Sequence, residues 1–599
     1  MKNSSKRLLV AFLAICMVGS AFTGCKKDDN SSSEADSSNV SSQPADNSTD
    51  SSSAGSDESQ DFYDQPSYSG DTVKLQFYID NQNPFGDWRK EFIKDKTGVE
   101  LEIVVADSEK TNAMLSAGNL PDIGNYAVSG DLSQAIKAGY LVDMSDKLDK
   151  LPNVVKNAPN AIQYAMDEKS DGTGKLYGIP RSVGLADIYA VDTTTYAMNI
   201  RWDIYREAGF PEVTSFDTML DALKKMQDVH PTAEDGTKMY AFELSPESDK
   251  ATNSNPWSAA FRLYGMSGFQ DVRGFLVYDI QNDELKPILD EDSQFMNAVR
   301  WFWKANQLGL ISPESKTQKN GDVSSKLLAG YTLTATPGSY YRGYNTDERI
   351  NAEEPIGIYP ISFEGMCPTV PGESLTGDQS WMYSISEATK DVDACLRVID
   401  LFYNEDACLT LYNSPKGELW DIVDGEVVAT DDYTDFYNNS TYTLKNGEVL
   451  ETGKFFFAFG LHTDWEHTVY GKTMRQSEWP EATELMTAKN GLIDLWAEHN
   501  PGYSVPSERY RAENTLVFRP AALSFTRNYD DDIAITAAAV GEQIITYAWN
   551  MIYASTEEEL NSLYNELVDK CNQLGIEECV KWGQEMWADA EALAEKYSQ

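Results

Sequence analysis

Aromatic side chains are the residues of this chain whose chemistry is most informative. The 599-residue sequence contains 13 Trp and 32 Tyr, more than a core of this size requires. Tryptophan and tyrosine combine a flat apolar face with a polar tip. Sugars present apolar C–H faces edged by hydroxyl groups, so this composition, together with abundant Asp, Asn, Arg and Gln, suits their recognition.

Several of these rings lie in loop-like surroundings. They are Trp257 in NSNPWSAAF, Tyr340 and Tyr341 in TATPGSYYRGY, Trp381 after Asp378-Gln379, and Trp465 in HTDWEH. Each ring taken singly fits core packing as well. We expect two or three of the set to line a ligand site.

Other chemistry leaves weak signals. His462 and His467 are five residues apart, not the four that place two zinc ligands on one helix face. The Asp530–Asp532 run fits a solvated acidic turn better than a calcium site. The sequence shows no phosphate-binding glycine loop and no nucleophile elbow, and acids are too abundant for any pair to indicate a glycosidase. We therefore expect no metal, no cofactor and no catalytic residues.

Charge and cysteine content exclude further classes. The formal net charge is −46 without basic clusters, which argues against nucleic acid as a partner and against charge-driven binding to an anionic membrane. Beyond the first 25 residues the cysteines are Cys367, Cys395, Cys408, Cys571 and Cys579. No pair has metal-finger or redox spacing, so they fit small buried side chains. Cys571 and Cys579 could form a disulfide only if their backbones lie close together.

The first 24 residues are typical of an export signal. Lys2, Lys6 and Arg7 precede an apolar run that is too short to span a membrane, and small residues come before Cys25. This pattern resembles a bacterial lipoprotein signal, in which Cys25 is lipidated and becomes the new N-terminus. An ordinary secretory signal with an incidental cysteine is the alternative. Residues 25–70 are rich in Ser and Asp, which predicts a disordered linker that holds a folded domain off a surface.

The folded part begins with alternating strands and helices. VKLQFYI (73–79) and VELEIVVA (99–106) are predicted strands, and a helix between them ends near Gly98. The next helix should end at Gly118, and Pro121 should lead into a buried strand. This βαβ order predicts a mostly parallel sheet, whose ligands bind beyond the carboxyl ends of the strands. Asn83, Trp88 and Tyr126 follow such ends.

The central segment, residues 174–228, predicts a further strand-to-helix arrangement. Ile200, Ile204 and Ala208 fall on one face of a predicted helix that ends at Gly209. Thr214 is the predicted cap of the next helix, with Asp217 three residues later.

The order of several motifs resembles one known family. These are Ser116-Ala117-Gly118-Asn119-Leu120-Pro121-Asp122, GKLYGIP from Gly174 to Pro180, Ile200-Arg201-Trp202-Asp203 followed by Gly209-Phe210-Pro211, the Trp381 strand, and Gly417-Glu418 with Trp420. Together with the closing helices they resemble the extracellular solute-binding proteins of carbohydrate ABC importers. The match is to the long, LplA-like lipoprotein subgroup called family 1, over most of residues 71–598.

This resemblance implies a periplasmic-binding-protein-like α/β fold, with two lobes, a hinge and a central cleft. Lobe 1 would comprise residues 71–185 and lobe 2 residues 186–376, whereas residues 377–599 would return to lobe 1 with additional C-terminal helical segments. The hinge crossings would lie near residues 179–186 and 377–384. The expected ligand-binding residues are Asn83, Trp88, Tyr126, Arg201, Trp257, Tyr340, Trp381 and Trp420.

The resemblance also implies a function. The protein would be a monomer, palmitoylated at Cys25 and anchored to the extracellular face of the cell membrane, which captures an oligosaccharide and delivers it to ABC-transporter permease subunits. A cell-surface polysaccharide-degrading enzyme, a glycoside hydrolase or lyase, would share the anchor, the linker and the aromatic residues. A peptide-binding lipoprotein is a third, minor reading.

Overall fold

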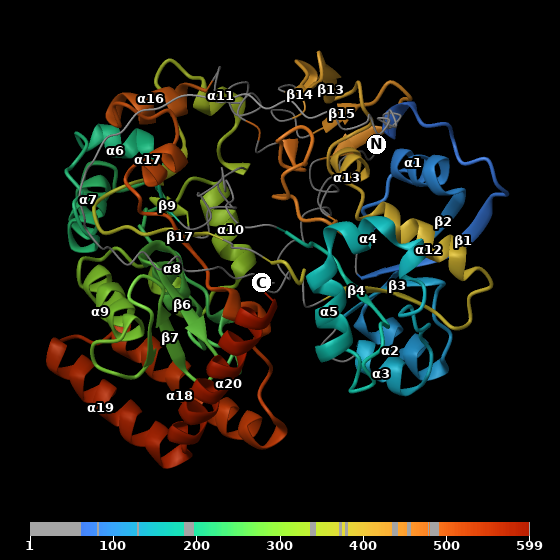
Figure 1. Cartoon of the computed structure of the whole chain (residues 1–599). Coiled ribbons are helices and arrows are strands. Elements are labelled where there is room, and N and C mark those ends of the chain that lie inside the picture. The colour runs from blue at the N-terminus through green and yellow to red at the C-terminus, as the bar shows by residue number, and fades with distance from the viewer. Residues whose placement is uncertain are drawn as a thin grey trace, which may run out of the picture.

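The structure is a computed structural model of the whole chain (Figure 1). It describes residues 62–80, 83–127, 131–184, 197–335, 343–370, 374–377, 381–433, 436, 441–451, 457–476, 479 and 490–597. Cys25 and Tyr340 lie outside these ranges.

A five-stranded sheet forms the centre of the first part of the chain. Strands β1 (Val73–Asp80), β2 (Val99–Ala106) and β3 (Ile123–Ala127) are parallel, as the βαβ pattern predicts, and the strand order is β2-β1-β3-β12-β4. β12 (Trp381–Ile385) returns from far along the sequence and runs antiparallel to β3 and to the short β4 (Ile179–Pro180). This late strand completes the sheet.

Glycines end the first two helices as predicted. α1 (Asp87–Thr97) ends at Gly98 and α2 (Ser108–Ala117) at Gly118, whose φ angles are 72° and 64°. Both glycines adopt the left-handed conformation that closes a helix C-terminus, which side chains other than glycine rarely tolerate. Pro121 then leads into β3.

The hydrophobic residues form two large cores, which define two lobes lying side by side (Figure 1). Lobe 1 is built on the five-stranded sheet. Its other elements are α3 (Asp131–Lys137), α4 (Pro152–Asn157), α5 (Pro159–Glu168), α12 (Val392–Leu401), α13 (Glu405–Tyr412), β13 (Trp420–Val423), β14 (Glu426–Ala429), β15 (Thr441–Thr443) and β16 (Val449–Glu451).

Lobe 2 is more helical, and its strands are short. The strand orders of its sheets are β10-β5-β9, β6-β7-β8 and β11-β17. The strands are β5 (Met198–Arg201), β6 (Phe269–Val272), β7 (Leu276–Asp279), β8 (Glu284–Pro287), β9 (Thr334–Ala335), β10 (Ile358–Ile361), β11 (Thr369–Val370) and β17 (Val517–Phe518). The helices before residue 370 are α6 (Trp202–Glu207), α7 (Phe216–Val229), α8 (Ser258–Ser267), α9 (Gln294–Gln307), α10 (Asn320–Leu328) and α11 (Asp347–Ile350).

Two local predictions in this lobe are wrong. Ile200 belongs to strand β5 and not to the following helix, because its backbone pairs with β10 and β9. The cap of α7 is Ser215 and not Thr214, since the Ser215 side chain accepts from the Thr218 backbone N–H and the Thr218 hydroxyl is paired reciprocally. This capping box shifts the helix start by one residue.

The last part of the chain does not all return to lobe 1. Buried residues up to Trp479 belong to the first core, whereas Leu492, Trp496 and later helical residues belong mainly to the second. These elements are α16 (Gly491–His499), α17 (Pro506–Ala512), the 3₁₀ helix η9 (Ala521–Phe525), α18 (Asp531–Ile552), α19 (Glu557–Leu574) and α20 (Ile576–Tyr597). Trp496 explains the difference, because it is fully buried and its indole N–H donates to the Pro360 carbonyl of β10.

The predicted linker also ends earlier than expected. The short 3₁₀ helix η1 (Phe62–Asp64) already packs on lobe 1, where the Tyr63 ring meets Trp420 at 5.7 Å and the Tyr63 hydroxyl donates to the Asp406 carbonyl. All five cysteines of the described chain are free, so Cys571 and Cys579 form no disulfide. None of the helices in the described ranges combines the length and the apolar character that crossing a membrane requires.

Candidate ligand-binding site

The carboxyl ends of the lobe 1 strands bring several polar and aromatic residues to one edge of the sheet. β1 ends at Asp80, and β3 ends at Ala127, which pairs with Trp381 at the start of β12. Met382 pairs with Pro180, so Arg181 leaves β4 beside Trp381. Such edges are where ligands bind in open α/β sheets.

Trp381 and Arg181 form a stacked pair at this edge. The Arg181 guanidinium lies 5.3 Å from the centroid of the Trp381 ring and 5.8 Å from that of Phe457. Trp381 is half-buried, whereas Phe457 is buried. A cation over one face of an indole ring is attractive and restrains the ring. Trp381 is therefore held in place while part of it reaches the surface.

Acidic residues lie close to the same edge. Asp131 begins α3, just after β3, and burial together with the negative charge of Asp80 raises the pKa of its carboxyl group. Burial also raises the pKa of the nearby Tyr78 to about 12. Carboxyl groups whose pKa is raised by burial and by a neighbouring negative charge are typical of functional sites. The sequence predictions missed Asp80, Asp131 and Arg181 as site residues, although Asp80 could have been found because it directly follows the predicted strand 73–79, and Arg181 lies within the predicted hinge region 179–186.

Tyr126 is not at the surface, contrary to the prediction. Its side chain is fully buried and stacks on Tyr78 with a centroid distance of 5.4 Å. A Cβ atom on Gly124 would lie only 1.9 Å from the Tyr126 ring, so the ring lies back over Gly124. Tyr126 is therefore a core residue of lobe 1, and burial raises the pKa of its hydroxyl.

Trp257 and Trp420 are also core residues. Trp257 is fully buried in lobe 2, with its ring against Phe295, Phe302 and Trp549. Trp420 is fully buried in lobe 1, where its indole N–H donates to the Ser414 carbonyl at 2.7 Å. Neither ring has a face to offer a ligand in this structure, because both complete the packing of a hydrophobic core.

Three further predicted residues have structural surroundings. Trp88 is buried beside Arg89, whose guanidinium lies 5.0 Å from its ring. Arg201 is buried and makes two hydrogen bonds to the Asp203 carboxylate, of 2.9 and 2.6 Å. Asn83 is exposed and accepts from the Phe85 backbone N–H in a turn. Asn83 lines a surface hollow with Lys74, Lys90 and Glu100. Trp381 is not among the residues that line this hollow.

The HTDWEH segment is structural as well. Trp465 is buried and donates to Glu405, and the His467 ring is buried 3.3 Å from an Asp406 carboxylate oxygen. Within the described ranges, no group of three or more His, Cys, Asp or Glu is arranged to hold a metal ion.

The chain leaves lobe 1 through a constrained backbone. Ser182 has a φ angle of 55°, and its backbone N–H donates to the Phe459 carbonyl. Gly184 donates to the Ser374 carbonyl, which places the two crossing segments side by side. A Cβ atom on Gly377 would lie 2.6 Å from the Arg181 carbonyl oxygen. This last contact, between Arg181 and Gly377, joins the two predicted hinge regions, 179–186 and 377–384.

Three solved structures with a similar fold are bacterial solute-binding proteins. An extracellular solute-binding protein from Bifidobacterium longum subsp. infantis matches at 15% identity and a TM-score of 0.51, over 89% of this chain and 100% of its own. The Streptococcus pneumoniae substrate-binding protein FusA, as an EF-hand mutant in complex with fructo-nystose, matches at 13% identity and a TM-score of 0.54, over 87% and 100%. The N-glycan transport solute-binding protein NgtS from S. pneumoniae matches at 16% identity and a TM-score of 0.50, over 87% and 99%.

These similarities confirm the predicted fold class, which is α/β and periplasmic-binding-protein-like. No family model matches the sequence, and no curated protein matches it.

Proposed function

We propose that this protein is an extracellular substrate-binding protein that captures an oligosaccharide and delivers it to the permease of an ABC transporter. The observation that carries the proposal is the half-buried Trp381, stacked on Arg181 at the carboxyl edge of the lobe 1 sheet. The fold supports it, since the solved relatives named above are solute-binding proteins, two of them named for N-glycan transport or bound to fructo-nystose.

The site would recognise sugar through two kinds of contact. One sugar ring would stack on the accessible part of Trp381, with Arg181 holding the indole from its other face. Asp80 and Asp131 would accept hydrogen bonds from sugar hydroxyls, which are strong when the acceptor is charged. The two lobes would then close on the ligand by a hinge movement, with the crossings near residues 179–186 and 377–384.

The domain organisation that we propose serves this task. Residues 1–24 would be a signal peptide and Cys25 would carry the lipid, including palmitate, that holds the monomeric protein on the outer face of the cell membrane. A flexible chain of about 35 residues up to Phe62 would reach roughly 35 Å from that surface. Lobe 1 would comprise residues 62–185 and 377–479, and lobe 2 would comprise residues 186–376 and 490–597.

The first experiment is a thermal-shift screen against plant and mucin oligosaccharides. We expect one sugar class to raise the melting temperature in a saturable way, because a ligand that binds only the folded state stabilises it. The enzyme alternative is tested with the same sugars carrying a label. Retention without cleavage supports the binding protein, and shortened products would support a hydrolase or lyase.

A further inference from the structure

The last helix of the chain connects the two lobes. α20 begins among buried residues of lobe 2, where Ile576 and Cys579 belong to the second core. Its last residue, Tyr597, is only 4% exposed and belongs to the first core. The helix therefore passes from one lobe to the other within its own length (Figure 1).

The beginning of α20 is fixed tightly on lobe 2. A Cβ atom on Gly583 would lie 2.4 Å from the Arg273 carbonyl oxygen, and one on Gly274 would lie 2.6 Å from the Cys579 carbonyl oxygen. Backbone thus packs directly on backbone here. Trp582 adds an indole hydrogen bond of 2.7 Å to Asp530, and the Trp587 ring lies 4.8 Å from Tyr278.

The end of α20 contacts helix α5 of lobe 1 through its last two residues, Lys596 and Tyr597. The Tyr597 hydroxyl lies 2.9 Å from Asp167 Oδ2 and 3.2 Å from Glu168 Oε1. The Lys596 ammonium lies 2.9 Å from the same Asp167 oxygen and 3.5 Å from Glu168 Oε1. Asn160 donates its side-chain N–H to the Tyr597 carbonyl at 2.8 Å.

Aromatic packing closes this contact from the side. The Tyr597 ring meets Tyr164 of α5 edge to face at 5.3 Å and stacks on Phe525 of η9 at 5.9 Å. Aromatic pairs of this kind stabilise beyond the area that they bury. Lobe 1 thus provides Tyr164, and the segments that pack on lobe 2 provide the other two rings.

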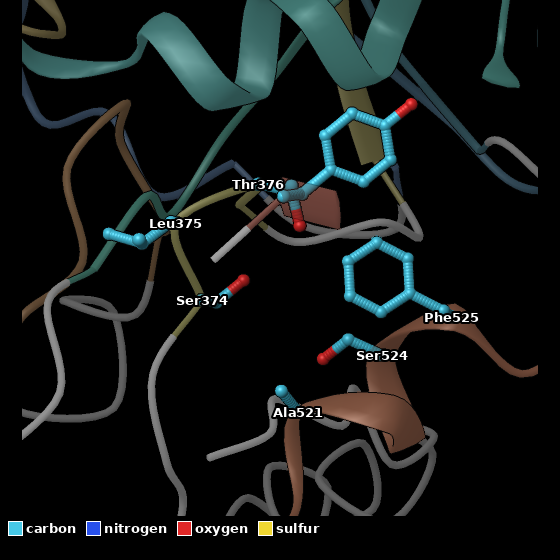
Figure 2. Close-up of a pocket in the computed structure, with 7 residues that line it drawn as sticks. Ser374, Leu375, Thr376, Ala521, Ser524 and Phe525 are labelled. Atoms are coloured by element: carbon cyan, nitrogen blue, oxygen red, sulfur yellow. The ribbon is translucent and has the colours of Figure 1, made fainter. Parts of the chain in front are cut away.

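The contact lies next to a segment that crosses between the lobes. Tyr597 and Phe525 line a small pocket together with Ser374, Leu375 and Thr376, which precede β12. Figure 2 shows Ser374 on one side of this pocket and Ala521, Ser524 and Phe525 on the other. A rotation of the lobes about this crossing would have to move α5 relative to the end of α20.

We propose that the last turn of α20 is an interlobe clasp, formed by Lys596 and Tyr597 with Asn160, Tyr164, Asp167 and Glu168, that sets the equilibrium between arrangements of the two lobes. The clasp holds the arrangement described here, because its polar and aromatic contacts all require α5 and α20 to be adjacent. The clasp would act in the unliganded protein, so it does not depend on sugar capture or on which ligand the protein binds.

The test is single-molecule energy transfer on the full chain without ligand. Labels are placed through noncanonical residues at Val155 of lobe 1 and Val229 of lobe 2, both 44% exposed. The variants are Lys596→Met and Tyr597→Phe, separately and combined, and both retain apolar contact. The control is Lys581→Met on the same helix, which removes only an exposed ion pair to Glu585.

We expect the combined variant to redistribute the interlobe distances. Loss of these contacts should change the ratio of lobe arrangements by roughly threefold or more, a modest change because the charged groups are partly exposed to solvent. The control should match the wild type. A distance distribution of the combined variant that coincides with the wild type, in molecules shown by circular dichroism to be folded, would overturn the proposal. Tyr597→Ala also removes the ring, so it should shift the interlobe distance distribution further than Tyr597→Phe does. A smaller shift than that of Tyr597→Phe would count against the clasp.

Discussion

At the scale of the residue, burial separates aromatic side chains that sequence alone treats alike. Trp257 and Trp381 both follow polar, loop-like residues, yet Trp257 is fully buried and Trp381 is half-buried. Composition could suggest that some aromatic rings contact a ligand, but it could not identify those rings. The exposure of a ring depends on neighbours that are distant in sequence, such as Phe295 and Trp549 beside Trp257. Sequence therefore could not separate the half-buried Trp381 from the buried Trp257.

Replacing Trp381 tests the stacking role. Trp381→Ala should weaken oligosaccharide binding about tenfold or more, because a buried aromatic anchor typically contributes about 2 kcal/mol. The melting temperature of the unliganded protein should change little. Calorimetric titration measures the affinity and thermal unfolding the stability. In Trp257→Ala, the matched control, we expect a large loss of stability, since its ring fills a core. Unfolding of Trp381→Ala would show that this ring, too, is structural.

Asp131 gives a prediction about pH. Burial and Asp80 raise the pKa of its carboxyl above the usual 3.8, so the folded state binds this proton more tightly than the unfolded state. Its contribution to stability is therefore present below pH 3.8 and is lost as the pH rises through the raised pKa. Asp131→Asn should increase the free energy of unfolding at pH 7 and change it little at pH 3.

Denaturant unfolding at both pH values measures this effect. The control is Asp149→Asn, an exposed acid of the same lobe, which should change stability little at either pH. Equal effects of Asp131→Asn at pH 7 and pH 3 would contradict the electrostatic argument.

At the scale of the element, local rules predicted the ends of α1 and α2 correctly, misplaced the starts of α6 and α7, and predicted side-chain direction poorly. The glycines that end α1 and α2, and the three parallel strands, follow from turn chemistry and apolar patterning. The prediction failed for Tyr126 because its ring folds back over Gly124 and packs on Tyr78 of the neighbouring strand. Such cross-strand packing depends on register, which the sequence of one strand does not contain.

The packing of Tyr126 over Gly124 predicts that the cost of replacing Gly124 depends on the side chain at position 126. Gly124→Ala should destabilise the protein by about 1–3 kcal/mol, because the added methyl group would overlap the ring. In the background Tyr126→Leu, the same change should cost much less. Chemical denaturation of the four proteins completes the cycle. Equal costs in both backgrounds would show that the ring does not restrict residue 124.

At the scale of the whole molecule, the two-lobed fold could be predicted from motif order, and the course of the chain only in part. The motifs around Gly118, Ile200 and Trp381 predicted, in that order, the first segment of lobe 1, lobe 2 and the return to lobe 1. Residues after 490 were expected in lobe 1, but the buried Trp496 and the helices that follow it pack mainly on lobe 2. A helix with an apolar face can pack on either lobe, and its own sequence does not indicate which lobe it will cover.

The lipid anchor is a prediction at this scale. Cys25→Ala should release the intact protein into the culture medium, because the acidic chain has no charge attraction to an anionic membrane that would retain it. Cell fractionation with immunoblotting measures the distribution, and Cys367→Ala is the matched control that should stay membrane-bound. Retention of Cys25→Ala on the membrane would rule out Cys25 as the anchor.

The central claim is that the folded chain binds an oligosaccharide at the carboxyl edge of the lobe 1 sheet, beside Trp381, and leaves it intact. Calorimetric titration with the sugar selected by thermal shift, followed by mass spectrometry of the recovered ligand, tests it most directly. We predict saturable binding of one sugar molecule per chain, weakened in Trp381→Ala, with the recovered sugar unchanged in mass. Absence of saturable binding for every sugar in the panel, or recovery of shortened products, would contradict the account.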